Sequence, residues 1–82
     1  MIGKSVQSEV IMKLKTRVFE LSTEKYTNLT ELARVMGISG AQIYRVRQGK
    51  RPINEKFIIG AIKAFPGYKL YELFYAEGNQ DD

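Results

Sequence analysis

The sequence predicts an all-α fold, a compact five-helix bundle, and three observations support this prediction. Apolar residues recur at helical spacing along most of the chain. Helix-capping residues, glycines and prolines separate these apolar segments from one another. The chain has 82 residues, 44% of them hydrophobic, which suits one small globular domain with a modest core. We therefore expect residues 1–82 to form a single domain.

The first helix is expected to run from Ser5 to Lys25. It carries an apolar stripe about 100° wide, formed by Val10, Ile11, Leu14, Val18 and Leu21. Met12 and Phe19 lie off this stripe. They are either wide core contacts or partly exposed groups, and in the second case they could belong to a partner-binding patch.

Residues 29–49 predict two short helices joined by a tight turn. Asn28 (or Thr27) can cap the first helix by accepting a hydrogen bond from an orphan backbone N–H group. Gly37 can end it, because glycine enters the left-handed conformation without steric cost. The apolar stripe of this helix consists of Leu29, Leu32, Ala33 and Met36.

The second helix of the pair is expected over about residues 39–48, capped by Ser39 and ended by Gly49. Ile38 is apolar and lies in the turn, so we expect it to point into the core. Two such helices joined by a turn of three or four residues form a helix-turn-helix motif, here at about residues 29–49.

The outward side of the second helix is polar. On a helical wheel of about 100° per residue, Ile43 and Val46 mark the buried side. The opposite side carries Ala41, Tyr44, Arg45 and Gln48. Arginine can bind both acceptors of guanine, and glutamine can bind adenine through two hydrogen bonds as well. This face is therefore expected to enter the major groove of DNA and read base edges.

The end of this helix is strongly basic. Arg45, Arg47, Lys50 and Arg51 fall within seven positions that contain no acidic residue. Lys50 and Arg51 follow Gly49, where they would neutralise sugar–phosphate charge rather than read bases. The simpler interpretation is a solvated charged face, which is common on surface helices. The coincidence with the turn motif favours nucleic acid.

A fourth helix is expected after Pro52, with Asn54 as its cap, and must end near Phe65 because the residue before Pro66 disfavours helix. Its inward residues are expected to be Ile58, Ile59, Ala61, Ile62 and Phe65.

Residues 68–75 are expected to form the last short helix. It would pack Leu70, Leu73 and Phe74 inward. Tyr71 and Tyr75 fall on its other side, either as solvated rim or as an interface, where tyrosine is enriched. The candidate contacts of a homodimer are therefore Met12, Phe19, Tyr71 and Tyr75. The polar, acidic tail at about 77–82 is expected to fray.

Composition narrows the classes of function. The chain has no cysteine and no histidine, so the usual zinc ligands and general bases are missing. The acidic residues are scattered, and no glycine-rich phosphate loop accompanies them. We therefore expect no catalytic residue, metal, cofactor or small-molecule ligand, and no enzyme activity. The net charge of +4 mildly favours polyanionic partners. No apolar run is long enough to span a membrane, and the first ten residues lack a secretory signal.

Residues 29–74 resemble the Cro and phage-repressor class of Xre-like helix-turn-helix transcriptional regulators. The pattern that carries the resemblance is LTELARVMGIS at 29–39, IYRV at 43–46, QGKRP at 48–52, Ala64-Phe65 and YELF at 71–74. The resemblance implies a cytoplasmic, prokaryotic or phage-encoded protein associated with the nucleoid, which binds operator double-stranded DNA, often as a dimer. It implies base contacts from Gly40, Ala41, Gln42, Tyr44 and Arg45. It also implies phosphate contacts through backbone N–H groups at Asn28 and Leu29. Together with these, the expected phosphate-contacting residues are Arg47, Gln48, Lys50 and Arg51.

The chain departs from the family pattern at two places. Many relatives have Trp-Glu where this chain has Val46-Arg47, so a base replaces an acid. Gly40 and Ala41 cannot make side-chain hydrogen bonds to bases, although Ala41 could touch a thymine methyl group. Direct readout would then depend on Gln42, Tyr44 and Arg45.

Two functional hypotheses follow. The first is a sequence-specific DNA-binding transcriptional regulator, acting as a repressor, whose recognition helix at about 39–48 enters the major groove. The alternative is a protein-interaction or antitoxin-like adaptor module that keeps the fold without operator binding. RNA binding is less favoured, because the chain shows no glycine clamp loop and no aromatic pair on a sheet.

Overall fold

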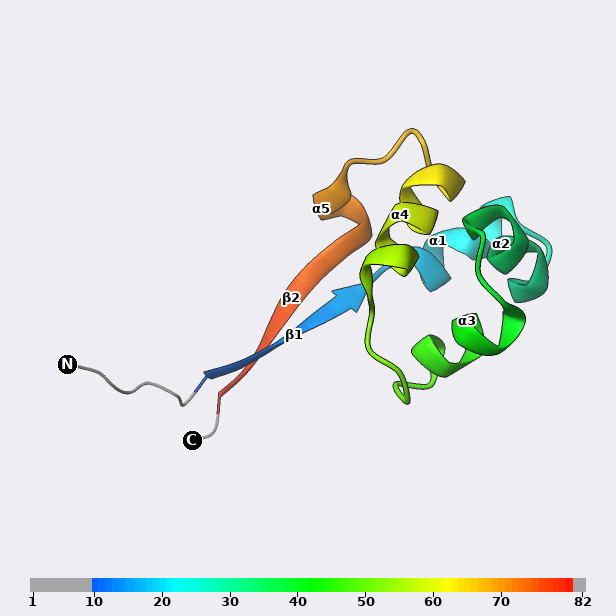
Figure 1. Ribbon diagram of the computed structural model, residues 1–82. Coiled ribbons are helices and arrows are strands. Elements are labelled where there is room, and N and C mark those ends of the chain that lie inside the picture. Colours follow the sequence, from blue (N-terminus) through cyan, green and yellow to red (C-terminus); the bar gives the residue numbers. More distant parts are fainter. Residues whose placement is uncertain (1–9, 81–82) are drawn as a thin grey trace.

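The computed structural model describes residues 10–80, which form a helical body with a ribbon of two strands extending from it (Figure 1). The molecule measures 49 × 26 × 22 Å, and its long axis follows the ribbon. In chain order the elements are β1 (Val10–Thr16), α1 (Val18–Lys25), α2 (Leu29–Met36), α3 (Gly40–Arg47), α4 (Glu55–Ala64), α5 (Leu70–Leu73) and β2 (Phe74–Gln80).

The prediction of an all-α fold is wrong. The strands β1 and β2 pair antiparallel, with Val10 opposite Gln80 and Thr16 opposite Phe74. The described part of the chain is therefore a mixed fold, with five helices and a two-stranded sheet. The strands come from opposite ends of the described chain, so their pairing closes the helical body between them.

The first predicted helix is too long, because residues 10–16 form β1 and α1 begins at Val18. Residues 12–15 alternate apolar and polar side chains, a period of two that suits a strand. The alternation places Met12 and Leu14 on one face and Lys13 and Lys15 on the other. Residues 5–9 of the predicted helix lie outside the described part.

Thr16 marks the change from strand to helix. Its hydroxyl donates a hydrogen bond of 2.9 Å to the carbonyl of Leu73 and accepts one of 3.1 Å from the backbone N–H of Val18. The N–H of Arg17 also donates to the carbonyl of Leu73, at 2.9 Å. These bonds start α1 and fix the base of the ribbon to α5.

The last predicted helix, over 68–75, shortens to the single turn of α5, after which the chain continues as β2. Leu73 and Phe74 are buried as expected, whereas Leu70 is 54% exposed. The tail was expected to fray from about residue 77, yet residues 77–80 pair with β1. Residues 81 and 82 lie outside the described part.

The helices α2, α3 and α4 confirm the predicted boundaries, because their predicted caps form. The side-chain oxygens of Asn28, Ser39 and Asn54 accept hydrogen bonds of 2.8, 3.1 and 2.9 Å from backbone N–H groups of the first helical turns. Gly37 ends α2 in the left-handed conformation, with φ of 78°.

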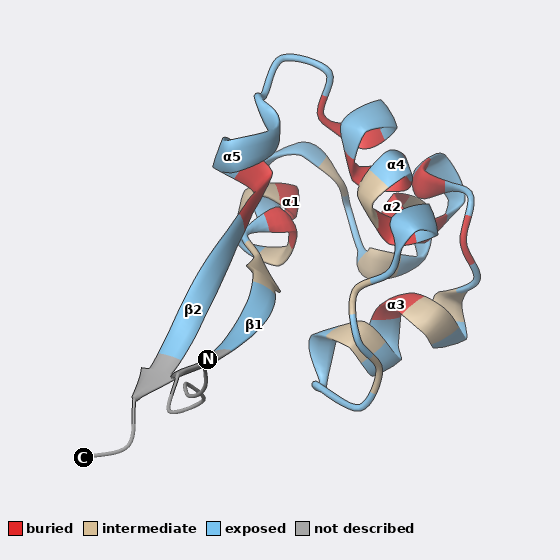
Figure 2. Cartoon of the chain, turned by 60° about the vertical axis from the view of Figure 1, so that its left-hand side comes forward, coloured by how far each residue is buried: buried red, intermediate tan, exposed pale blue. Residues whose placement is uncertain are grey.

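The core lies between the helices α1 to α4 and the base of the ribbon (Figure 2). Its buried apolar residues are Val18, Leu32, Ala33, Met36, Ile38, Ile43, Phe57, Ala61, Ala64, Phe65, Leu73 and Phe74.

The inward face of α4 differs from the predicted one. Ile59 and Ile62 are 46% and 47% exposed, whereas Phe57, Gly60 and Ala61 are buried. A Cβ atom added at Gly60 would lie 2.5 Å from the carbonyl oxygen of Met36 in α2. The helix therefore turns its small residues toward α2, and this close approach carries the isoleucines outward.

Within residues 10–80, no helix combines the length and the apolar character needed to cross a membrane.

Candidate nucleic-acid interface

Helix α3 is held by its N-terminus and by its buried side. The N–H of Gln42 donates to the Ser39 hydroxyl oxygen at 3.1 Å, and the N–H of Ser39 donates to the Gln42 side-chain oxygen at 3.0 Å. This reciprocal cap satisfies two orphan N–H groups of the helix end. Ile43 is fully buried, and Val46 packs against the core. The orientation of α3 is therefore fixed on the body.

The outward face of α3 is the one that the helical wheel predicts. Ala41, Tyr44, Arg45 and Gln48 are all exposed, and Tyr44 keeps 45% of its surface accessible. Among the described residues the ion pair formed is Lys15–Glu77, so no acidic side chain neutralises Arg45. The guanidinium group of Arg45 and the hydroxyl of Tyr44 are thus free to donate hydrogen bonds to an external acceptor.

The reciprocal cap restricts Gln42. A two-point contact with adenine needs both the oxygen and the nitrogen of a glutamine amide. Because the oxygen of Gln42 accepts from Ser39, the amide nitrogen alone remains to donate. With Gly40 and Ala41 lacking polar side-chain groups, hydrogen-bonded readout from this helix falls mainly to Tyr44 and Arg45.

The start of α2 offers backbone groups rather than a side chain. The Asn28 side chain accepts from the N–H of Glu31 and is occupied as the cap. Leu29 is half-buried, so its side chain faces the body. Its N–H belongs to the first helical turn, where backbone donors have no intrahelical partner and can bind a phosphate. The implied phosphate contact at this helix therefore depends on the N–H groups.

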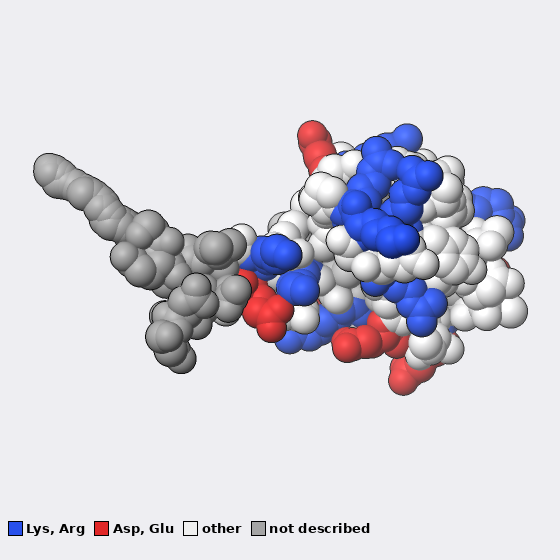
Figure 3. Space-filling view, turned by 90° about the horizontal axis from the view of Figure 1, so that it is seen from below, with Lys and Arg blue, Asp and Glu red and all other residues white. Residues whose placement is uncertain are grey.

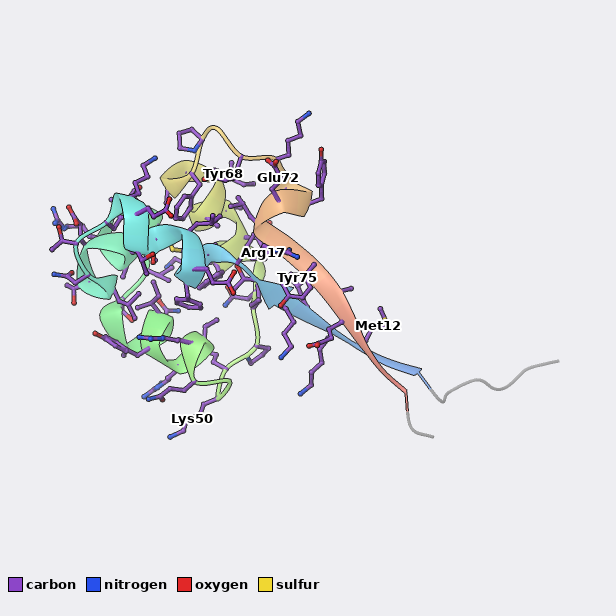
Figure 4. All side chains as sticks on the ribbon, turned by 180° about the vertical axis from the view of Figure 1, so that it is seen from behind. Met12, Arg17, Lys50, Tyr68, Glu72 and Tyr75 are labelled. Carbon is purple, nitrogen blue, oxygen red and sulfur yellow. The ribbon has the colours of Figure 1, made fainter. Side chains whose placement is uncertain are left out.

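Gly49 turns the chain back toward α3 with a φ of 78°. After this turn the N–H groups of Lys50 and Arg51 donate to the carbonyl oxygen of Arg45, at 2.9 and 3.2 Å. These bonds keep Lys50 and Arg51 next to the end of α3. The side chain of Lys50 projects away from the body (Figure 4).

A groove separates β1 from the end of α3 and the loop that follows it. We call this the β1 groove. It has a volume of about 550 Å³, and its basic lining residues are Lys13, Lys15, Arg47, Lys50 and Arg51. None of the residues that line it is acidic. Seen from the α3 side, the largest cluster of Lys and Arg side chains contains no acidic group (Figure 3).

Sequence reasoning missed Lys13 and Lys15 as candidates. A helical assignment for residues 5–25 separates the two side chains around the helix by about 200°. On a strand, residues two apart share one face, so Lys13 and Lys15 lie side by side. Because β1 runs along the groove, residues of both its faces line it, and these two lysines are among them. The alternation of Met12, Lys13, Leu14 and Lys15 was the available signal.

The candidate homodimer contacts do not form one patch. Met12, Phe19 and Tyr75 line the β1 groove, whereas Tyr71 lies on α5 and is 71% exposed. Phe19 also packs against Phe57, with ring centroids 6.1 Å apart. The guanidinium of Arg17 lies 4.2 Å from the centre of the Tyr75 ring, at the base of the ribbon (Figure 4).

Comparisons of the chain with protein-family models, with curated proteins and with solved structures found no match. The geometry of α3 and of the β1 groove is therefore the basis of the function proposed below.

Proposed function

We propose that this protein is a sequence-specific double-stranded DNA-binding transcriptional regulator of the cytoplasm that acts as a repressor. Helix α3 enters the major groove with its outward face toward the bases. One observation carries the proposal: the exposed face of α3 continues into a basic loop, and no acidic side chain of the described residues pairs with it. The resemblance of residues 29–74 to Xre-like regulators supports the same function.

The basic end of this surface and its outward helix face are expected to have different roles, phosphate contact and base contact. Arg47, Lys50 and Arg51 can neutralise phosphates, which gives affinity that falls with salt but carries no sequence information. Tyr44 and Arg45 face the base edges. A good two-point arginine–guanine contact contributes about 1–3 kcal/mol of discrimination against a wrong base. We therefore expect the protein to discriminate at few base pairs of its site, chiefly at a guanine.

A domain of this size offers one short helix to the groove, which limits the contact area. High affinity would need two copies on half-sites about 34 Å apart, one turn of the duplex. If each of the two copies neutralises about three to five phosphates, the log of the affinity of the dimer should fall with the log of salt at a slope of roughly −5 to −9.

The test combines selection from a random duplex pool with binding assays on the selected sequence and on a scrambled one. Arg45→Ala should weaken binding to the selected duplex by about 1–3 kcal/mol and much less to the scrambled one, because it removes base readout. Lys50→Ala is the matched control, since it removes one positive charge near the same helix. It should weaken binding to both duplexes equally and reduce the magnitude of the salt slope by about 0.9 for each bound chain.

Equal losses on both duplexes for Arg45→Ala would remove the readout role from this residue. Failure of the wild-type protein to bind any duplex at low salt would overturn the proposed function.

The alternative function is a protein-interaction or antitoxin-like adaptor module. Two observations favour it: the start of α3 carries Gly40 and Ala41 in place of hydrogen-bonding side chains, and Leu70 and Tyr71 on α5 are 54% and 71% exposed. This function predicts a stoichiometric protein complex that persists in high salt and is lost in Tyr71→Ala, while duplex selection returns no motif.

A further inference from the structure

We propose that the β1 groove binds the phosphodiester backbone of the DNA strand that flanks the major groove occupied by α3. The ribbon is then a second DNA-binding element, with Lys13 and Lys15 as its contact residues. The inference rests on the proposed function and extends its contact surface from α3 to the strand β1.

The groove has the charge that a phosphodiester chain requires. Its basic groups come from three segments: Lys13 and Lys15 from β1, Arg47 from α3, and Lys50 and Arg51 from the loop that follows α3. No acidic residue lines the groove, but Glu77 of β2 lies opposite Lys13 in the ribbon and pairs with Lys15. Each phosphate that these groups neutralise releases condensed counterions, which favours binding.

The spacing on β1 also suits a phosphate backbone. Residues two apart on a strand are separated by about 6.7 Å along its axis. A DNA strand carries one charge per about 3.4 Å of helix axis, so the two lysines can meet separate phosphates. They share one face of β1, and the hydrogen bonds of Thr16 to Leu73 and Val18 hold the base of that strand.

The β1 groove is continuous with the face of α3. Arg47 belongs to α3 itself, and Lys50 and Arg51 are tied to the Arg45 carbonyl through their N–H groups. A duplex that places base edges against Arg45 therefore brings phosphates toward the groove. This continuity favours nucleic acid over an acidic peptide as the occupant.

One ion pair must open for this contact. The amine of Lys15 lies 3.7 Å from the Glu77 carboxylate across the ribbon, and the two side chains are 44% and 60% exposed. Exposed pairs of this kind contribute about 0–1 kcal/mol. Exchanging the carboxylate for a phosphate therefore costs little.

The experiment compares three double variants in duplex binding between about 0.1 and 0.3 M salt. Lys13→Gln with Lys15→Gln removes two phosphate contacts per bound chain and should reduce the magnitude of the salt slope by about 1.8 for each bound chain. The affinity should fall, for each bound chain, about 60-fold at 0.1 M salt and about 9-fold at 0.3 M, equally on selected and scrambled duplexes. Lys13→Arg with Lys15→Arg should retain wild-type binding, because it keeps both charges.

The matched control is Lys63→Gln with Lys69→Gln. Both residues are exposed, neither lines the groove, and the net charge falls by the same amount. Lys63 lies at the end of α4 and Lys69 directly before α5, on the side of the body away from α3 (Figure 1). This variant should bind with a salt slope close to that of the wild type. Circular dichroism checks that every variant is folded.

A folded Lys13→Gln, Lys15→Gln variant with the wild-type salt slope would overturn this inference and leave the proposed function intact. An equal loss in the control variant would also overturn it, because net charge alone would then explain the effect. If the wild-type protein binds no duplex, both the proposed function and this inference fail.

Discussion

At the residue scale, the end of α4 depends on one hydroxyl group. The Tyr26 hydroxyl donates a hydrogen bond of 2.7 Å to the carbonyl oxygen of Ala64, the last residue of α4. Ala64 is fully buried, so water cannot easily replace this donor. Tyr26→Phe keeps the ring, which packs edge-on against Phe65, and removes the donor alone. The free energy of unfolding should fall by about 1–2 kcal/mol, measured by urea denaturation.

Tyr68→Phe is the matched control. Its ring also packs edge-on against Phe65, but the side chain is 43% exposed and no hydrogen bond of its hydroxyl occurs within residues 10–80. Its stability should stay within about 0.5 kcal/mol of the wild type. Equal losses in the two variants would show that the hydroxyl of Tyr26 contributes nothing specific.

The readout side chains show how far a single residue can be predicted. The wheel position of Arg45 follows from local helix geometry, so its exposure was predictable from the sequence. The capping role of Ser39 was predictable for the same reason. The helical wheel could not predict that the side-chain oxygen of Gln42 accepts a hydrogen bond from the N–H of Ser39. This contact depends on the rotamer that Gln42 adopts in the first turn.

At the element scale, local signals and long-range pairing differ in how well they can be predicted. The boundaries of α2, α3 and α4 were predictable, since caps and left-handed glycines act within one turn. β2 carries no such signal, because Gly78 and Asn79 both disfavour strands. Its pairing with β1 joins residues that lie 58 to 70 positions apart in the sequence, from Thr16–Phe74 to Val10–Gln80. Because the groove depends on this pairing, it was not predicted either.

The contact between α2 and α4 depends on the absence of a side chain at Gly60. Alanine normally stabilises a helix interior by about 1 kcal/mol relative to glycine. Here the new Cβ would lie 2.5 Å from the backbone oxygen of Met36, and backbone cannot move aside as a flexible side chain can. Overpacking costs about 1–3 kcal/mol, so Gly60→Ala should be destabilising overall.

Gly40→Ala provides the comparison by thermal or urea denaturation, because nothing lies within 4 Å of a Cβ atom at this helix start. Its stability should be unchanged or higher by up to about 1 kcal/mol. Similar stabilities for Gly40→Ala and Gly60→Ala would contradict the close approach of α2 and α4.

At the scale of the whole molecule, the distribution of charge matters more than the net charge of +4. The basic groups of α3, its following loop and β1 adjoin one groove, while the ribbon supplies a single carboxylate beside it, from Glu77. This carboxylate competes with phosphate for Lys15. A folded chain therefore presents a stronger field to a polyanion on this side than its composition suggests.

Removing the carboxylate of Glu77 should strengthen DNA binding. Glu77→Gln frees Lys15 to bind a phosphate without an exchange step, and it also removes a charge that repels DNA. Because Lys15 already contacts a phosphate in the wild-type complex, the salt slope should stay close to that of the wild type. The affinity should rise by up to about 5-fold per bound chain, which is the about 0–1 kcal/mol that opening the exposed pair costs. Glu24→Gln raises the net charge equally from an exposed position on α1 that does not line the groove, and it should leave the affinity close to that of the wild type. An equal rise in affinity in both variants would assign the effect to net charge and count against a role for Lys15.

The free energy of unfolding should change by less than about 1 kcal/mol in either variant, since the Lys15–Glu77 pair is exposed.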